Sequence, residues 1–289
     1  MKFWQSLSFT EPDQLIEIAK LAEQAGFEGV LVSDHLFHPE KIVSKYPYTE
    51  DGVPGFHAET PWPEPFSTVA AMAAVTRRLR FATLVYILPL RHPIPVAKAC
   101  ATLDVLTQSR FALGVGAGWM KEEFDQLGVD FHTRGARFDE SLEVLRKLWR
   151  PGVAEHRGRF FDLPRLQMSP TPARPIPLWV GGNSPAALRR AAKLGDGWLG
   201  TGTDAAQASR DLADVARLRA EAGRAREPFE TIVPLTTPPD PDVLRRLEDQ
   251  GAHGTVSYPF LYTLGPTSSL DEKRRYLEGF AENVIRKAR

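Results

Sequence analysis

The sequence has little cysteine, no excess of either charge and no long apolar segment. Cys100 is the single cysteine, so no internal disulfide can form, and its apolar surroundings predict a buried thiol in a reducing cytosol. Lys plus Arg and Asp plus Glu both number 36, so no net charge favours nucleic acid or an acidic membrane surface. No stretch approaches the roughly 18 apolar residues of a membrane span, and the amino terminus is too short and too polar for a signal peptide. These absences favour a cytosolic protein whose partner is a small molecule.

The 289 residues, 43% hydrophobic and 25% charged, have the composition of a globular enzyme and fit one domain over 1–289. Apolar strand-like runs alternate strictly with helix-like periodicity. The expected strands are 2–7, 28–32, 80–86, 110–115, 178–180, 196–199, 231–235 and 253–257, and the expected helices are 10–25, 65–76, 95–107, 135–149, 184–194, 204–222, 240–250 and 268–286. Eight such units predict a (β/α)8 TIM barrel, with an open doubly wound sheet as the alternative.

Two long segments interrupt the alternation. Residues 38–63, after the second strand, show no helical pattern but contain several aromatic side chains, which argues against disorder and favours a lid. His57 and Trp62 of this loop are candidates for a substrate pocket. The Pro-rich segment 150–177, before the fifth strand, is expected to be a packed surface excursion without a catalytic role.

The second strand ends in Ser33-Asp34-His35, at the edge where barrel enzymes place their chemistry. Asp34 and His35 are adjacent and cannot share a strand face, so the spacing does not imply a direct relay between them. Asp34 and His35 are both candidate catalytic residues, His35 as the proton donor, and a structural Asp-His pair is an equally good interpretation. Capping and turn formation are the preferred roles for Arg91-His92-Pro93.

The glycine-rich run Phe-Ala-Leu-Gly-Val-Gly-Ala-Gly-Trp (111–119) resembles a nucleotide-binding motif but does not satisfy one. A dinucleotide fingerprint needs G-x-G-x-x-G opening a helix directly after a strand, whereas this run reads G-x-G-x-G and the next helix is expected near residue 135. It also lacks the Lys-Ser/Thr of a phosphate-binding P-loop. Gly116, Ala117 and Gly118 are therefore expected to let a flat ligand approach the backbone, with Trp119 as an apolar wall; close strand packing is the alternative.

A phosphate site is expected further along the chain. In Leu-Trp-Val-Gly-Gly-Asn-Ser-Pro (178–185), glycines follow a strand and Pro185 opens a helix whose free N–H groups would face the barrel mouth. Gly181, Gly182 and Asn183 are the candidate ligands, and Thr201 and Gly202 of the next loop could add hydroxyl and amide donors. A plain capped helix is the alternative.

Together these motifs resemble the bacterial luciferase-like monooxygenase superfamily, in particular its group that uses the 5-deazaflavin coenzyme F420. The resemblance rests on the order and spacing of several short motifs rather than on any one of them. They are Ser-Asp-His (33–35), Pro-Leu-Arg-His-Pro (89–93), 99–106, 113–119, Arg-Gly (134–135) with Phe-Asp-Glu (138–140), Leu-Trp (148–149), Trp-Val-Gly-Gly (179–182) and Asp-Gly-Trp (196–198).

The resemblance implies a (β/α)8 barrel that holds F420, or alternatively FMN, across the carboxyl ends of its strands, and it suggests a homodimer. By position, the cofactor phosphate would lie at the glycine loop 181–183, and Asp34 would contact the cofactor headgroup. His35 would be the proton donor or orienting group beside the substrate. A cis peptide bond that supports the ring system would fall at Leu84–Val85.

The chain departs from one branch of that superfamily. The F420-dependent glucose-6-phosphate dehydrogenases have glutamate where Trp119 stands and tryptophan where Pro39 stands, so a more apolar or aromatic substrate is expected here. The function expected from the sequence is therefore hydride transfer between F420 and an organic substrate, with an FMN-dependent monooxygenase or a non-catalytic flavin-binding barrel as alternatives. No metal site is expected, because Asp34 alone does not supply the carboxylate or ligand set of a barrel hydrolase or isomerase.

Overall fold

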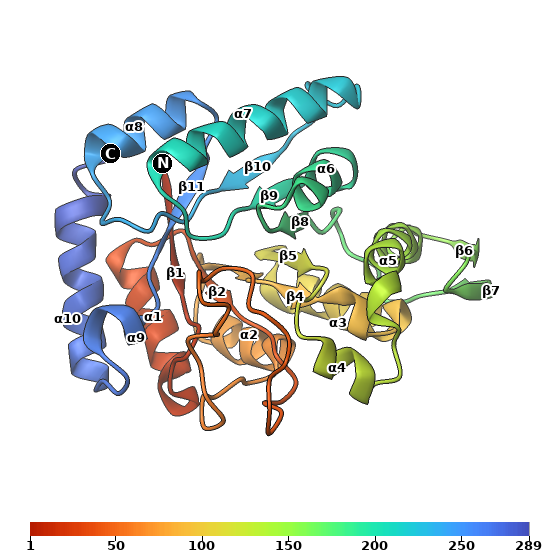
Figure 1. The fold of residues 1–289 in the computed structure, drawn as a ribbon, viewed down its shortest axis with the longest axis horizontal. Coiled ribbons are helices and arrows are strands. Elements are labelled where there is room, and N and C mark those ends of the chain that lie inside the picture. The colour runs from red at the N-terminus through yellow and green to blue at the C-terminus, as the bar shows by residue number, and fades with distance from the viewer. Residues whose placement is uncertain (289) are drawn as a thin grey trace.

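The computed structural model describes residues 1–288, which form a closed parallel barrel surrounded by helices (Figure 1). The barrel strands are β1 (Lys2–Ser6), β2 (Gly29–Val32), β3 (Arg80–Thr83), β4 (Tyr86–Ile87), β5 (Phe111–Gly116), β8 (Leu178–Gly181), β9 (Gly197–Leu199), β10 (Glu230–Ile232) and β11 (Gly254–Ser257). The order is β3-β2-β1-β11-β10-β9-β8-β5-β4, and an additional β3–β5 pairing closes the ring. β3 and β4 are two parts of one barrel strand, separated by the cis peptide bond Leu84–Val85. The predicted TIM barrel and the cis bond expected from the resemblance are confirmed.

The helices cover the outside of the barrel. They are α1 (Leu15–Ala25), α2 (Pro65–Ala74), α3 (Pro93–Thr107), α4 (Lys121–Gln126), α5 (Arg134–Leu148), α6 (Pro185–Leu194), α7 (Ala205–Glu221), α8 (Pro241–Asp249), α9 (Phe260–Leu264) and α10 (Leu270–Phe280). Short 3₁₀ turns lie at Pro12–Gln14, Leu88–Leu90 and Phe131–Thr133, and a π turn at Ala281–Ile285 follows α10. Within the described residues, no helix is both long and apolar enough to span a membrane.

The structure contains a hairpin and a helix that the sequence pattern did not predict. The segment 150–177 contains an antiparallel hairpin, β6 (Val153–Arg157) and β7 (Asp162–Gln167), which projects beside α5 at the right of Figure 1. Helix α4 begins only five residues after β5, so the absence of a helix before residue 135 was not a valid reason to reject a dinucleotide motif. The G-x-G-x-G spacing and the barrel topology still argue against that motif.

Two tryptophans fill the barrel interior, and glycines on the strands make room for them. Trp4 and Trp179 are fully buried and meet edge to face, with ring centroids 5.4 Å apart. A Cβ atom at Gly29 would lie 2.3 Å from the Trp4 ring, and one at Gly197 would lie 2.4 Å from the Trp179 ring. The interior is therefore a solid core, as expected for this fold, and ligands can bind only at its ends.

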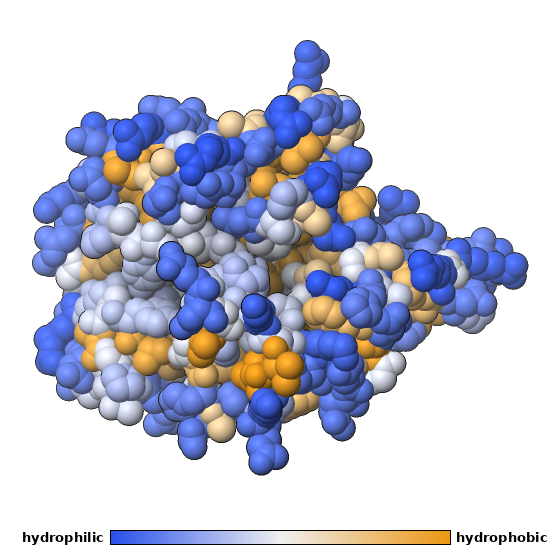
Figure 2. All heavy atoms as spheres, in the orientation of Figure 1, coloured by the Kyte–Doolittle hydropathy of each residue, from blue (hydrophilic) through white to orange (hydrophobic). Residues whose placement is uncertain are grey.

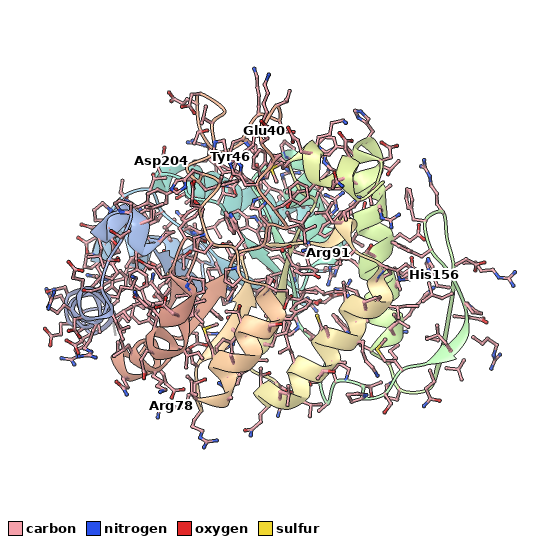
Figure 3. The ribbon with its side chains drawn as sticks, turned by 90° about the horizontal axis from the view of Figure 1, so that it is seen from below. Glu40, Tyr46, Arg78, Arg91, His156 and Asp204 are labelled. Atoms are coloured by element: carbon pink, nitrogen blue, oxygen red, sulfur yellow. The ribbon has the colours of Figure 1, made fainter. Side chains whose placement is uncertain are left out.

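The two ends of the barrel differ in character. Arg80, at the start of β3, stacks on both interior tryptophans and is paired with Glu230 and Glu28. Figure 3 shows Arg78, which precedes β3, at one end of the molecule, and Tyr46 and Asp204, which follow β2 and β9, at the other. The end marked by Tyr46 and Asp204 carries the loops after the strands, and every sequence-predicted site residue lies in one of these loops or at the carboxyl end of a strand.

Candidate active site

A buried carboxylate holds the imidazole of His35 at the end of β2. The Nδ1 atom of His35 lies 3.3 and 3.2 Å from the two carboxylate oxygens of Glu123, and the N–H of Leu36 donates to the same carboxylate at 2.8 Å. The Glu123 side chain is fully buried and that of His35 is 9% exposed. A carboxylate at Nδ1 favours the tautomer with the proton on that nitrogen, which leaves Nε2 to exchange a proton with a ligand. Among the described residues, Nε2 has no hydrogen-bond partner.

The sequence reasoning did not identify Glu123 as part of the site. Residues 121–123 are three charged residues after the glycine run, and the sequence pattern predicts no helix there, whereas α4 positions Glu123. The available sequence signal was the position of Glu123, a carboxylate shortly after a strand end, while its complete burial is visible in the structure alone. The partner of Glu123 is 88 residues away, so no local spacing links the two.

Asp34 is held in a buried ion pair. Its oxygens accept hydrogen bonds from Nη1 and Nη2 of Arg91, at 2.5 and 2.7 Å, and from the N–H of Ile87 at 2.9 Å. The pKa of Arg91 is raised, because attraction to Asp34 and the hydrogen bonds between them outweigh the effect of burial, which lowers it. This geometry supports a positioning role for Asp34, which fixes the β2 end against β4, rather than the catalytic role expected from the sequence. His92 caps α3 by accepting from the N–H of Ile94, as expected.

The space beside the β5 glycines is already filled by side chains. A Cβ atom at Gly116 would lie 2.5 Å from a methyl carbon of Val85, and one at Gly118 would lie 2.7 Å from a methyl carbon of Ile87. The expectation that Gly116 and Gly118 leave room for a ligand is thus corrected: close packing, the stated alternative, explains them. A Cβ atom at Gly181 would also lie 2.5 Å from Val85, so Val85 forms a ledge between β5 and β8. Ala117 is half-buried next to it.

The loop after β8 combines a helix amino terminus with a clamped asparagine. Ser184 caps α6 by accepting from the N–H of Ala187, and Pro185 begins the helix. The Asn183 side chain donates to Asp211 and accepts from the N–H of Thr201. The Thr201 N–H and the side-chain oxygen of Asn183 are therefore engaged, whereas the bond to Asp211 uses one of the two hydrogens of the Asn183 NH₂ group.

Other groups of this loop still suit an anion. Gly182 adopts φ +107°, a backbone conformation that favours glycine. At the start of α6, Pro185 has no N–H and the Ala187 N–H is used by Ser184, so the Ala186 N–H is the donor left in the first turn, where the positive end of the helix dipole favours negative charge. Gly202, in the loop after β9, is exposed. The residues of both loops therefore offer backbone and hydroxyl donors rather than charged ones.

Aromatic side chains from three segments, the loops after β1, β2 and β5, gather around His35. We call Phe9, Phe56, Trp62 and Trp119 the aromatic wall. The centroid of the His35 ring lies 4.8 Å from that of Trp62, 5.2 Å from that of Phe56 and 5.9 Å from that of Trp119. Phe9 contacts Trp62 at 5.4 Å. Two of the expected pocket residues, Trp62 and Trp119, are thus brought together beside His35.

His57 does not belong to this group. Its side chain is 71% exposed and pairs with Glu59 on the surface of the loop. The neighbouring residue Phe56 turns inward instead, and the sequence reasoning did not list it as a pocket residue. Adjacent residues in an extended loop point to opposite sides, so an inward Phe56 places His57 outside.

The loop 38–63 is fastened across the mouth. The carboxylate of Glu122 accepts hydrogen bonds from the N–H groups of Val43 and Ser44 and from the Ser44 hydroxyl, at 2.5, 3.0 and 2.7 Å. The Tyr46 ring meets that of Trp119 at 5.0 Å. Burial, with smaller effects of Tyr48 and Tyr262, raises the pKa of Tyr46 to about 12, so Tyr46 is uncharged at neutral pH. The loop forms the lid that the sequence predicted.

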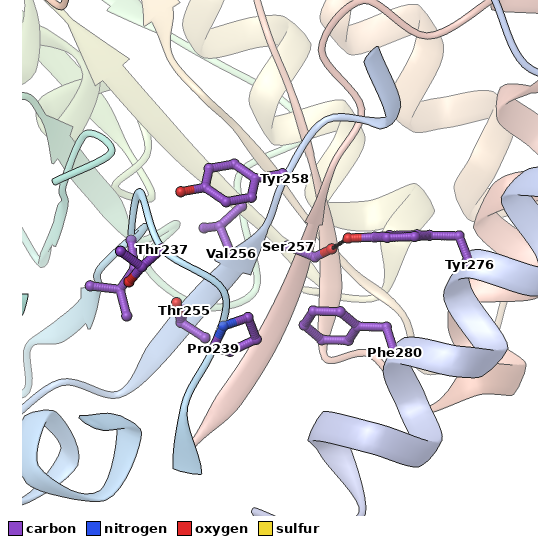
Figure 4. Close-up of a pocket in the computed structure, with 9 residues that line it drawn as sticks. Thr237, Pro239, Thr255, Val256, Ser257, Tyr258, Tyr276 and Phe280 are labelled. Atoms are coloured by element: carbon purple, nitrogen blue, oxygen red, sulfur yellow. Dashed lines mark hydrogen bonds between the residues drawn. The ribbon is translucent and has the colours of Figure 1, made fainter. Parts of the chain in front are cut away.

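The measurable cavities lie away from His35. Figure 4 shows a cavity of about 30 Å³ between β11, the loop 235–239 and α10, where Ser257 and Tyr276 share a hydrogen bond of 2.9 Å. A shallow groove of about 300 Å³ separates α1 from α10. Over residues 1–288 no group of three His, Cys, Asp or Glu side chains is arranged to hold a metal ion.

Comparison with known proteins links this site to a family. The family model described as luciferase-like monooxygenase matches residues 3–276. An uncharacterised protein of Mycobacterium tuberculosis is 43% identical over 289 residues, which cover 99% of this chain and 100% of the relative. An F420-dependent glucose-6-phosphate dehydrogenase of Nakamurella multipartita is 31% identical over 244 residues, which cover 82% of this chain and 67% of the relative.

Solved structures share the fold. An F420-dependent secondary alcohol dehydrogenase, in complex with an F420–acetone adduct, aligns with a TM-score of 0.78 at 17% identity and covers 100% of this chain and 99% of its own. The oxygenating constituent of 3,6-diketocamphane monooxygenase of Pseudomonas putida, in complex with FMN, aligns with a TM-score of 0.63 at 20% identity, covering 81% and 66%. At such identities the likeness concerns the fold alone.

Proposed function

Because the chain belongs to the luciferase-like monooxygenase family, we propose that it is an F420-dependent oxidoreductase that transfers a hydride between the deazaflavin and an organic substrate. The observation that carries the proposal is the buried His35–Glu123 pair, in contact with the lid aromatics Phe56 and Trp62 and at the same end of the barrel as the Val85 ledge. This arrangement combines a proton-exchanging group, a support for a flat ring and a cover that excludes water. Relatives named as F420-dependent enzymes add to the case for that cofactor.

The residues at the mouth fit a cofactor with a flat ring and a phosphate. The amino terminus of α6 would hold the phosphate, since the helix dipole favours an anion there, and the glycines 181–182 would let the phosphate approach the backbone, although the Gly182 N–H itself donates to the carbonyl oxygen of Leu199 at 3.1 Å. Val85 would lie under the ring system. Asn183 would act indirectly, because its side chain joins this loop to Thr201 and to α7.

When bound, F420 gives or takes a hydride at C5, and the protein supplies position, shielding and a proton. His35 holds that proton at Nε2 and delivers it to the substrate, or removes it in the reverse direction. Glu123 fixes the ring orientation and stabilises the positive charge of the imidazolium form. The lid, fastened by Glu122 and Tyr46, excludes water while the proton is transferred.

An FMN-dependent monooxygenase is the second candidate. The same phosphate loop and the same ledge would suit FMN, and the family that the chain matches is described by monooxygenase activity. The two candidates differ in the need for molecular oxygen. Turnover under anaerobic conditions therefore separates them.

The test of the proposal is anaerobic oxidation of reduced F420 by a panel of ketones, enones and imines, followed by the return of the visible absorbance of the oxidised deazaflavin. With a substrate in hand, His35→Ala should lower kcat by at least about 100-fold, the usual contribution of general acid–base catalysis, while F420 still binds. An unchanged rate in the folded variant, or turnover only with reduced FMN and oxygen, would contradict the proposal.

A further inference from the structure

The aromatic wall presents apolar surface beside the proposed proton donor. Phe56 contacts Trp62 at 5.1 Å and Trp119 at 6.3 Å, both nearly edge to face, so the rings stand at steep angles to one another. Phe9 reaches both Phe56 and Tyr262 of α9. Rings arranged in this way complement the faces and edges of another flat ring, with centroid distances of roughly 4.5–7 Å.

The mouth has few cations that could receive an anionic substrate. In the described part of the chain, the loops after β1, β5, β8, β9, β10 and β11 (7–11, 117–120, 182–184, 200–204, 233–240 and 258–269) contain no Lys or Arg. In Figure 2 a pale area of intermediate hydropathy occupies the left centre of the face, between blue margins of hydrophilic residues.

The basic side chains that do occur nearby are either engaged or exposed. Arg91 is neutralised by Asp34, and Arg134 donates to the carbonyl oxygens of Gly118 and Phe131. The lid lysines, Lys41 and Lys45, are exposed on its surface. An anionic group brought under the lid would thus be buried without a partner, at a cost of several kcal/mol.

One buried donor beside His35 is unused. The Nε1–H of Trp62 is buried and has no hydrogen-bond acceptor among the described residues. Buried polar groups without partners are rare, and each costs about 1–3 kcal/mol. A ligand that places an acceptor oxygen between Trp62 and His35 would accept a hydrogen bond from the Trp62 Nε1–H. The rings of Trp62 and His35 are in contact, with centroids 4.8 Å apart, so one ligand oxygen can be expected to reach both side chains.

From these observations we infer that the substrate is an uncharged, flat, largely apolar molecule, an aromatic or fused-ring ketone or the corresponding alcohol, whose oxygen meets His35 and Trp62. The inference rests on the proposed function. In the reducing direction a hydride adds to the carbonyl carbon, the π electron pair moves to the oxygen, and that oxygen takes the proton from Nε2 of His35. The product is the secondary alcohol, and reduced F420 supplies the hydride.

The test compares two ligands that differ only in charge: 2-acetylnaphthalene and 6-acetyl-2-naphthoate. Their binding is measured by titration calorimetry, with F420 absent and at saturation. The neutral ketone should bind at least about 10-fold more tightly than the carboxylate, since the carboxylate lacks a cation under the lid. Equal or tighter binding of the carboxylate, or binding of neither ligand, would overturn the inference.

Three variants locate the binding site. Phe56→Ala and Trp62→Phe should weaken binding of the neutral ketone, by about 10-fold for the lost ring and by about 2- to 10-fold for the lost N–H donor. Phe160→Ala, in the hairpin turn away from the mouth, is the matched aromatic truncation and should leave binding unchanged. Ketone binding that survives Phe56→Ala would overturn the inference.

Titration of the same samples with F420 separates this inference from the proposed function. If F420 fails to bind while the ketone preference holds, the proposed function fails and the substrate class stands. If F420 binds but the preference for the neutral ketone is absent, only the inference about the substrate fails.

Discussion

Replacing Glu123 by glutamine removes a charge from the site without changing its shape. Glutamine has one acceptor oxygen, and the N–H of Leu36, 2.8 Å from the present carboxylate, needs it. The amide NH₂ then faces Nδ1 of His35 as a donor, where the carboxylate had been an acceptor at 3.2 and 3.3 Å. The neutral imidazole is thereby driven to carry its proton on Nε2, and the protonated ring loses its counter-charge.

The size of the effect follows from the hydrogen bond that is lost. Hydrogen bonds to charged groups contribute about 1.5–3 kcal/mol, and each 1.36 kcal/mol is about a tenfold change in rate. Glu123→Gln should therefore lower kcat for proton-coupled hydride transfer by about 10- to 150-fold. KM should change little, because Glu123 contacts His35 and the backbone rather than the ligand.

Single-turnover oxidation of reduced F420, with F420 binding and urea unfolding measured on the same protein, provides the assay. Glu122→Gln is the matched control, since the neighbouring carboxylate holds the lid and not His35. The Glu122→Gln control should speed amide hydrogen exchange in 38–63, and its loss in the chemical step should be smaller than that of Glu123→Gln, because His35 keeps its carboxylate partner. A folded Glu123→Gln variant with a wild-type rate would refute the positioning role.

Three further predictions concern stability. Asp34→Asn leaves the Arg91 guanidinium buried without a counter-charge. The free energy of unfolding, measured by urea titration, should fall by about 3–5 kcal/mol. A loss below about 1 kcal/mol would argue against the ion pair. Gly114→Ala places a Cβ atom 1.9 Å from a backbone oxygen and should prevent stable folding, whereas Gly279→Ala, in α10 with open space around it, should raise the midpoint of thermal unfolding slightly. Because burial raises the pKa of Tyr46 to about 12, the folded protein keeps a phenol proton that the unfolded chain releases above about pH 10, so the free energy of unfolding should fall between about pH 10 and pH 12. Tyr46→Phe should reduce that fall. An equal fall in both proteins would count against a buried Tyr46.

The barrel was predictable because its strands are short apolar runs separated by amphipathic helices, a pattern that local sequence expresses directly. The ends of those strands also indicated where His35, Trp119 and the glycine loop at 181–182 would lie. The same reasoning failed where the structure depends on distant partners. Glu123 pairs with a residue 88 positions away, and Asp34 with one 57 positions away, so no periodicity could reveal either contact.

The glycines show a second limit of sequence reasoning. A glycine signals that something approaches its backbone closely, but not what approaches. At Gly116 the neighbour is the side chain of Val85, and at Gly118 it is that of Ile87. The space where a Cβ atom would lie is therefore taken up by protein side chains. The lid was recognised from its aromatic content, yet which of its residues face inward, Phe56 rather than His57, depends on the folded path of the loop.

The choice of cofactor is the central claim, and an equilibrium titration tests it directly. Oxidised F420 and FMN are added separately to the protein, and binding is followed by the intrinsic fluorescence of the tryptophans, two of which, Trp62 and Trp119, lie at the mouth beside His35. We predict saturable quenching by F420, with FMN binding at least about 10-fold more weakly, a difference of about 1.4 kcal/mol. Saturable binding of FMN with no response to F420 would contradict the account.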